Sequence, residues 1–148
     1  MNTLTAFASE FKLTKQVSNF QQSKITSSID AANYARQFYY DDLEIFESFF
    51  VIYLNHANKT IGFVKIGQGG INSATADPRL ILKYAIESLA SAIVLVHNHP
   101  SGNTQPSPQD LKLTRQIIDI AKLLEVKVLD HVILTSDTYY SFADHGNI

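Results

Sequence analysis

The chain has 148 residues, enough for one domain with a substantial core. Hydrophobic residues make up 45% of it and charged residues 18%, as in an ordinary globular protein. The formal net charge is −2 and the pI about 6.2, so the overall charge gives no sign of non-specific nucleic-acid binding, although a local basic patch could lie within that average. No run of about 18 apolar residues predicts a membrane span, and Met1–Lys15 lacks a secretory signal pattern. We therefore expect a cytoplasmic protein.

The first half of the chain predicts a short N-terminal segment followed by the start of a domain. Residues 1–26 are polar, with a possible edge strand at Phe11–Thr14 and a linker, and residues 27–148 form the domain. Ser28–Tyr40 has helical spacing of its apolar residues, and Ser28 can cap it. The apolar run Glu44–Asn55 predicts a strand that is buried on both faces.

Helices and strands alternate in the second half. Asp77 and Pro78 predict the N-cap and first residue of a helix over Arg79–Leu89. Further strands are expected at Thr60–Ile66, Ala92–Val96, Val126–Thr135 and Tyr139–Phe142, with a long helix at Gln109–Leu124. The order β-α-β-β-α-β-α-β-β predicts the α/β class, with a mixed central sheet flanked by helices.

The stretch Val94–Asp110 carries most of the chemically competent side chains. Alternate strand residues share a face, so His97 and His99 point the same way, roughly 6.5 Å apart. Asp110 follows eleven residues after His99. Two imidazoles and a carboxylate leave one tetrahedral position for water, the pattern of a catalytic zinc site. The same donors also suit non-haem iron or manganese, whereas a thiolate site is excluded because the chain has no cysteine. An HxH pair alone is weak evidence, since most such pairs are strand residues without a metal.

A local explanation for the acid exists as well. Ser107, Pro108 and Asp110 fit the N-cap, first and third positions of the following helix, where an acid favours the helix dipole. The two interpretations are compatible, because a capped helix start is a rigid mount for a ligand.

These residues together resemble a known motif. HxH, then ten residues and Asp, with Ser three before that Asp, resembles the JAMM (MPN+) metalloprotease motif. The fuller string HNHPSG, followed by LDH at Leu129–His131 and SFA..G at Ser141–Gly146, is similar to the RadC family in particular. The resemblance runs from about Ser27 to the C-terminus. It implies the JAMM/MPN (cytidine-deaminase-like) architecture and one Zn²⁺ per chain on His97, His99 and Asp110.

The resemblance also assigns further roles. It implies that Ser107 stabilises a tetrahedral intermediate and that an upstream Glu is the general base. Glu47, in Glu-Ser-Phe, matches that Glu, and Glu44 is a competitor that the sequence alone does not separate from it. Around the site, Gly69 or Gly70 would let a substrate backbone approach closely. The family's PRE motif is only partly kept, since Arg79 matches its Arg but Leu80 replaces its Glu.

Asp130 and His131 have two open interpretations. The pair could hydrogen-bond to a zinc-bound imidazole and hold it in place. It could equally be a buried polar pair that satisfies itself.

Three functions follow from this reading. The first is a zinc-dependent hydrolase that cleaves a peptide or isopeptide amide in a peptide or protein substrate, using metal-activated water. The second is a DNA repair-associated RadC-like protein acting on or near nucleic acid. RadC members often carry an N-terminal helix-hairpin-helix module, for which this chain has no room, so DNA binding is not transferred from it. The third is a catalytically inert metal-binding interaction domain. A two-metal nuclease is not expected, because the motif supplies the ligands for one metal ion and no second acidic cluster is found in the sequence. The sequence does not predict the oligomeric state.

Overall fold

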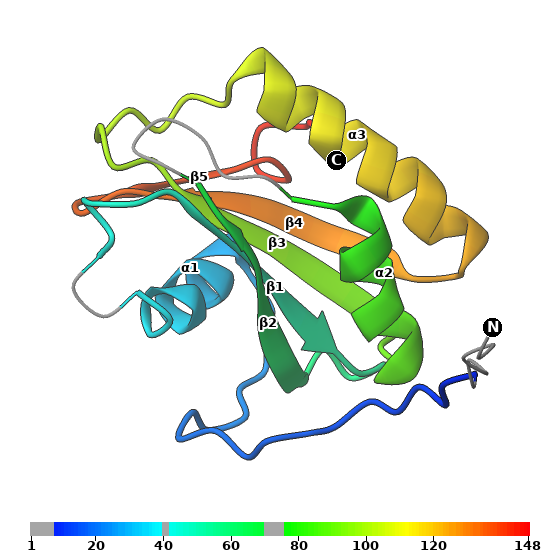
Figure 1. Cartoon of the computed structure of the whole chain (residues 1–148). Helices are drawn as coiled ribbons and strands as arrows, with labels where there is room; N and C mark the ends of the chain where they lie inside the picture. The colour runs from blue at the N-terminus through cyan, green and yellow to red at the C-terminus, as the bar shows by residue number, and fades with distance from the viewer. Residues whose placement is uncertain (1–7, 40–41, 70–75) are drawn as a thin grey trace, which may run out of the picture.

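The structure is a computed structural model that describes residues 8–39, 42–69 and 76–148. Its elements confirm the α/β class with a mixed central sheet flanked by helices (Figure 1). The helices are α1 (Ser28–Arg36), α2 (Pro78–Glu87) and α3 (Pro108–Leu123). The strands are β1 (Ser48–Leu54), β2 (Thr60–Gln68), β3 (Ala92–Asn98), β4 (Lys127–Leu134) and β5 (Tyr139–Ser141).

The five strands form one sheet in the order β2-β1-β3-β4-β5. β1 runs antiparallel to both β2 and β3, β3 runs parallel to β4, and β5 returns antiparallel to β4. The parallel pair needs a crossover, which α3 supplies. The carboxyl end of β3 therefore leads through a loop to the N-terminus of α3, and this is where the candidate site lies.

Helices cover both faces of the sheet. Alternate residues of β3 point to opposite sides: Val94 and Val96 join the core beneath α1, while Ile93 and Leu95 pack with α2 and α3. Figure 1 shows α1 on one side of the sheet and the other two helices on the opposite side. Because both faces are covered, every residue of β1 and β3 is buried, as a continuous apolar run predicts.

Several predicted bounds are corrected by the structure. The expected edge strand at Phe11–Thr14 is wrong, because this stretch has no regular structure. The segment instead pairs later, where Lys24 bridges to Lys59 beside the start of β2. The first helix is capped by Ser27 rather than Ser28 and ends at Arg36, four residues early.

The most consequential correction concerns the strand predicted over Glu44–Asn55. β1 begins only at Ser48, and residues 43–45 form a turn instead. Glu47 is thus the last residue before the strand, not a member of it.

The described helices include none that is both long and apolar enough to cross a bilayer.

Candidate metal centre

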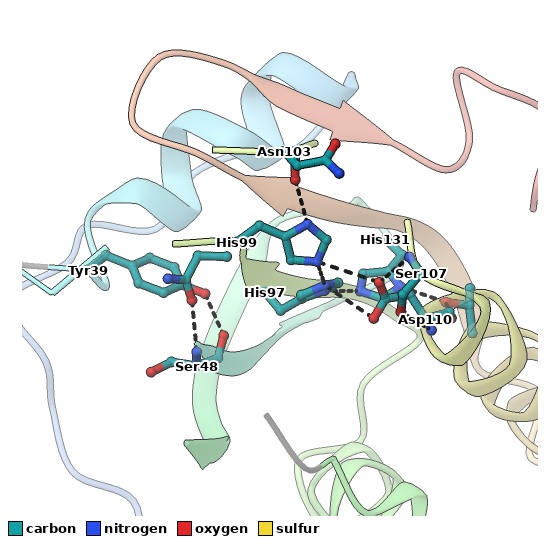
Figure 2. A network of polar contacts seen from close by, with 10 residues as sticks. Tyr39, Ser48, His97, His99, Asn103, Ser107, Asp110 and His131 are labelled. Carbon is teal, nitrogen blue, oxygen red and sulfur yellow. Dashed lines mark hydrogen bonds and ion pairs between the residues drawn. The ribbon is translucent and has the colours of Figure 1, made fainter. Parts of the chain in front are cut away.

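The two histidines of the HxH pair converge as the strand spacing predicts. His97 is the penultimate residue of β3, 1% exposed, and His99 follows one residue after the strand. The main-chain N–H of His99 donates to the Leu134 carbonyl (2.9 Å), so strand-like pairing persists past the end of β3. The Nε2 atoms of the two rings lie 3.0 Å apart. Figure 2 shows both rings turned toward the start of α3.

Asp110 reaches the same point from α3. Its carboxylate oxygens lie 3.3 Å from Nε2 of His97 and 3.5 Å from Nε2 of His99. The predicted helix start is confirmed as a full capping box: Ser107 Oγ accepts from the Asp110 N–H (3.1 Å), and the Ser107 N–H donates to the Asp110 carboxylate (2.7 Å). With Pro108 at the first helical position, the cap holds the acid rigidly beside the imidazoles.

Glu47, which directly precedes β1, approaches the two histidines from the strand that neighbours β3. One of its carboxylate oxygens and one nitrogen from each of His97 and His99 all lie within 4.8 Å of one another, a group that could hold a metal ion. Glu44, its sequence competitor, is exposed on the 43–45 turn. Glu47 and Asp110 therefore both lie beside the two histidines, and Ser107 caps the helix that carries Asp110, so all five residues expected from the motif belong to this cluster.

Hydrogen bonds to the outer ring nitrogens fix the tautomers of the two histidines. Nδ1 of His99 lies 2.6 Å from the Asn103 carbonyl, which can only accept, so that nitrogen carries the hydrogen. Its Nε2 is then the lone-pair nitrogen when the ring is neutral. The dashed line between His99 and Asn103 in Figure 2 marks this contact.

His97 is fixed by a longer chain of contacts. The Thr114 hydroxyl donates to the Asp110 main-chain carbonyl (2.6 Å), so it must accept from Nδ1 of His131 (2.6 Å). Nε2 of His131 then accepts from Nδ1 of His97 (2.8 Å). This order of donors leaves Nε2 of His97 as a lone pair that faces Asp110 and His99.

The inward-facing atoms are consequently all acceptors. Two lone-pair nitrogens and two carboxylates at these distances repel one another unless a cation lies among them. The group of Glu47, His97 and His99 could hold a metal ion through oxygen and nitrogen ligands, and the second nitrogen of each imidazole is already engaged. Asp110 contacts both imidazoles from α3.

The acid–base properties agree with that arrangement. Burial lowers the pKa of His99, but the Asp110 carboxylate and the Asn103 carbonyl outweigh it, and the net pKa is raised. Burial by itself raises the pKa of Asp110, but the His97 and His99 rings, which donate to its carboxylate when they are protonated at Nε2, hold that pKa far below its usual range. Asp110 is therefore ionised at any physiological pH, and His99 is the group on which a proton competes with a metal.

The sequence pair Asp130–His131 divides into two separate roles. His131, fully buried, is the residue that contacts His97. Burial, and then the nearby His97, hold its pKa well below the usual value, so it stays neutral. Asp130 instead accepts from the Ser141 hydroxyl (2.6 Å) and from the main-chain N–H groups of His131 and Ala143. It organises the strand end and makes none of its hydrogen bonds to the imidazole side chains.

Four residues of the site were not predicted from the sequence: Asn98, Asn103, Thr114 and Tyr39. Thr114 lies four residues after Asp110 in α3, so helical spacing alone places both on one face. Asn103 acts through its main-chain carbonyl, for which a side-chain pattern gives no signal. Of the predicted glycines, Gly69 donates its N–H to the Glu47 carbonyl (2.9 Å), and Gly70 lies outside the described residues.

Comparison with known proteins places this site in a family. Residues 25–147 match the RadC-like JAB domain. A UPF0758 protein of Flavobacterium johnsoniae is 43% identical over 100 residues, 68% of this chain and 44% of that protein. The UPF0758 protein YkfG of Escherichia coli is 40% identical over 68% of the chain and 63% of that protein. A UPF0758 protein of Salinibacter ruber is 33% identical over 97% of the chain and 63% of that protein. The chain thus spans less than two thirds of the length of these relatives, and their names state no activity.

Proposed function

The chain belongs to the RadC-like JAB domain family, and we propose that it is a zinc-dependent hydrolase that cleaves a peptide or isopeptide amide bond with activated water. The observation that carries the proposal is the inward convergence of His97, His99, Asp110 and Glu47, with both outer imidazole nitrogens already hydrogen-bonded. Such a constellation binds a cation and leaves a carboxylate beside it for proton transfer.

His97, His99 and Asp110 would hold one zinc ion per chain. Zinc is proposed over iron or manganese because the JAMM resemblance favours it, while the ligand types alone admit all three. A bound zinc ion supplies Lewis acidity, which lowers the pKa of a coordinated water toward about 7.

Two residues outside the ligand set would do the remaining chemistry. Glu47 accepts the proton of the attacking water and returns it to the leaving amine, so that an amide and water become a carboxylic acid and an amine. Ser107 uses its oxygen as acceptor for the helix cap, which leaves its hydroxyl hydrogen to donate to the developing oxyanion of the substrate carbonyl. The unidentified substrate is a peptide or protein that presents such an amide.

The proposal is tested first by elemental analysis of the purified protein beside the His99→Ala variant. About one zinc per chain, lost in the variant, is the expected result. No metal in either protein after zinc is supplied would make the histidines framework residues and defeat the proposal.

Hydrolysis is tested next with a library of quenched fluorescent peptides and an isopeptide-linked probe. Glu47→Gln should lower kcat/KM by about 10²–10⁴-fold while zinc stays bound. Ser107→Ala should lower it by a hundredfold or more, the usual loss for one oxyanion donor. The hydrolase proposal would fail if the zinc-loaded wild type cleaved no probe, or if the Glu47→Gln variant cleaved the probes as fast as the wild type. Either result would favour a metal-binding interaction domain.

A further inference from the structure

One side chain of the neighbouring strand β3 makes three hydrogen bonds to the segment that carries Glu47. This segment, residues 43–48, consists of a turn (43–45), two residues outside any helix or strand (46–47) and Ser48, the first residue of β1, so residues 43–47 have no strand ladder. The Asn98 side-chain NH₂ donates to the carbonyls of Leu43 (2.6 Å) and Phe46 (2.7 Å). Its oxygen accepts from the Ser48 N–H (2.8 Å). Glu47 lies between the last two of these contacts.

Asn98 is suited to this task by its chemistry and its place. It is completely buried, and it stands between His97 and His99, so strand alternation turns its side chain to the opposite face of the sheet from theirs. A side-chain amide offers two hydrogens and one carbonyl oxygen, and here all of them are used. Aspartate cannot donate to two carbonyls, and alanine would remove this partner from one buried and two partly buried main-chain groups.

Two further hydrogen bonds hold the same segment. The Tyr39 hydroxyl donates to the Ser48 carbonyl (2.8 Å), and the Gly69 N–H donates to the Glu47 carbonyl (2.9 Å). Figure 2 shows the Tyr39 ring reaching Ser48 beside the histidine cluster. Burial, with the Asp42 and Glu47 carboxylates adding, raises the pKa of Tyr39 well above its usual value, so the hydroxyl keeps the proton that it donates. Main-chain groups at and beside Glu47 are therefore held by Asn98 of β3, by Gly69, which follows β2, and by Tyr39, which follows α1.

We propose that Asn98 is a positioning residue that holds the Glu47 carboxylate beside the metal-ligating nitrogens of His97 and His99. One residue of β3 thus ties the base-bearing segment to the strand that carries two ligands. The inference rests on the proposed function for the role of Glu47, but the position of that carboxylate can be tested without any substrate.

The experiment is a double-mutant cycle on zinc affinity in the full chain. The variants are Asn98→Ala, Glu47→Gln and the two combined, with zinc binding measured by competition with a fluorescent chelator. A carboxylate within 4.8 Å of both histidine nitrogens favours the cation, so Glu47→Gln should weaken zinc binding about tenfold, the lower end for groups outside the ligand set. Asn98→Ala should weaken it by a similar factor alone, and less than about twofold in the E47Q background.

A matched control and a milder variant accompany the cycle. Asn55 accepts from the N–H groups of Ala57 and Lys59 in the β1–β2 turn, away from the site, and Asn55→Ala should leave zinc affinity unchanged. Should Asn98→Ala fail to fold, Asn98→Ser keeps one donor and carries the same comparison. Hydrogen exchange adds a direct readout: residues 43–48 should lose protection in the Asn98 variants while residues 50–54 of β1 keep it.

The possible results separate cleanly. Equal losses of zinc affinity in both backgrounds would mean that Asn98 supports the histidine strand rather than Glu47. No loss in either single variant would mean that Glu47 is not held near the ion. Unchanged protection over residues 43–48 would also overturn the inference. Failure of every amide probe would defeat the proposed hydrolysis but not this cycle, since only zinc binding and exchange are measured.

Discussion

Thr114→Val is the sharpest test of how this site prepares its ligands. Valine keeps the shape of threonine but removes the hydroxyl, which donates to the Asp110 carbonyl and accepts from Nδ1 of His131. Without that acceptor, the buried N–H of His131 is stabilised best by moving to the other nitrogen. His131 would then donate to Nδ1 of His97, and the proton of His97 would move to Nε2, the nitrogen needed by the metal.

The size of the effect follows from one buried hydrogen bond. A buried donor left unsatisfied costs about 1–3 kcal/mol, and zinc binding must restore that unfavourable tautomer. At about 1.4 kcal/mol per tenfold, zinc affinity should fall by roughly 5- to 150-fold. This range includes the loss of about 10–100-fold in metal affinity that is typical when a group hydrogen-bonded to a metal ligand is removed. Competition with a fluorescent chelator measures this change, and imidazole ¹⁵N chemical shifts in the metal-free protein report which nitrogen of His97 carries the hydrogen.

Thr114→Ser provides the control for this prediction. Serine loses the methyl group but keeps the hydroxyl, so zinc affinity should stay within a few-fold of the wild type. The reasoning is refuted if Thr114→Val binds zinc as tightly as the wild type, or if serine and valine weaken binding equally.

Three further predictions concern pH, strand-end order and the core. Because the folded pKa of His99 is raised, its charged form should stabilise the metal-free protein below about pH 6.5, and this stability should be lost as pH rises through the raised pKa. Zinc affinity should rise over the same interval as the proton is displaced; thermal unfolding and chelator competition at a series of pH values check both signs. Asp130→Ala should lower the free energy of unfolding in urea by about 2–4 kcal/mol, because the hydrogen bonds to its charged carboxylate are lost. Asp130→Asn keeps an oxygen acceptor and should lower the free energy of unfolding by less than half of that amount. Ile117 lies on the buried face of α3, so Ile117→Ala should lower the free energy of unfolding by about 2–5 kcal/mol with zinc affinity unchanged. A weakened affinity would show that the core and the site are coupled.

Much of the site could be predicted because its residues are close in sequence. The spacing of His97 and His99 on a strand, and of Ser107 and Asp110 at a helix start, follows from local geometry, and the structure reproduces both. The strand and helix types were also predicted correctly from periodicity, apart from the N-terminal edge strand. What local patterns could not supply was the contact between segments far apart in the chain.

The roles of Asp130 and His131 illustrate that limit. In the register of β3 with β4, Ile93 pairs with Val128 but Val94 pairs with Asp130, so Leu129 is an extra residue. A one-residue slip exchanges the two faces of a strand. Without the bulge Asp130 would share the face of Leu95 and the metal centre, and His131 would point toward α1. No alternation pattern in the sequence fixes the bulge, so the two interpretations stayed open until the pairing was known.

The choice between Glu47 and Glu44 depended on a similar long-range contact. A continuous strand over Glu44–Asn55 would place the two acids three residues apart, on opposite faces, and no residue in this stretch predicts a break in the strand. Asn98 provides that reason, because its amide binds two carbonyls of the turn and one N–H at the start of β1. Main-chain groups that hydrogen-bond to this amide do not need a partner in a strand ladder. β1 therefore begins at Ser48, four residues after the predicted start, and Glu44 is exposed. The same amide that shortens β1 is thus the group that leaves Glu47 facing the histidines.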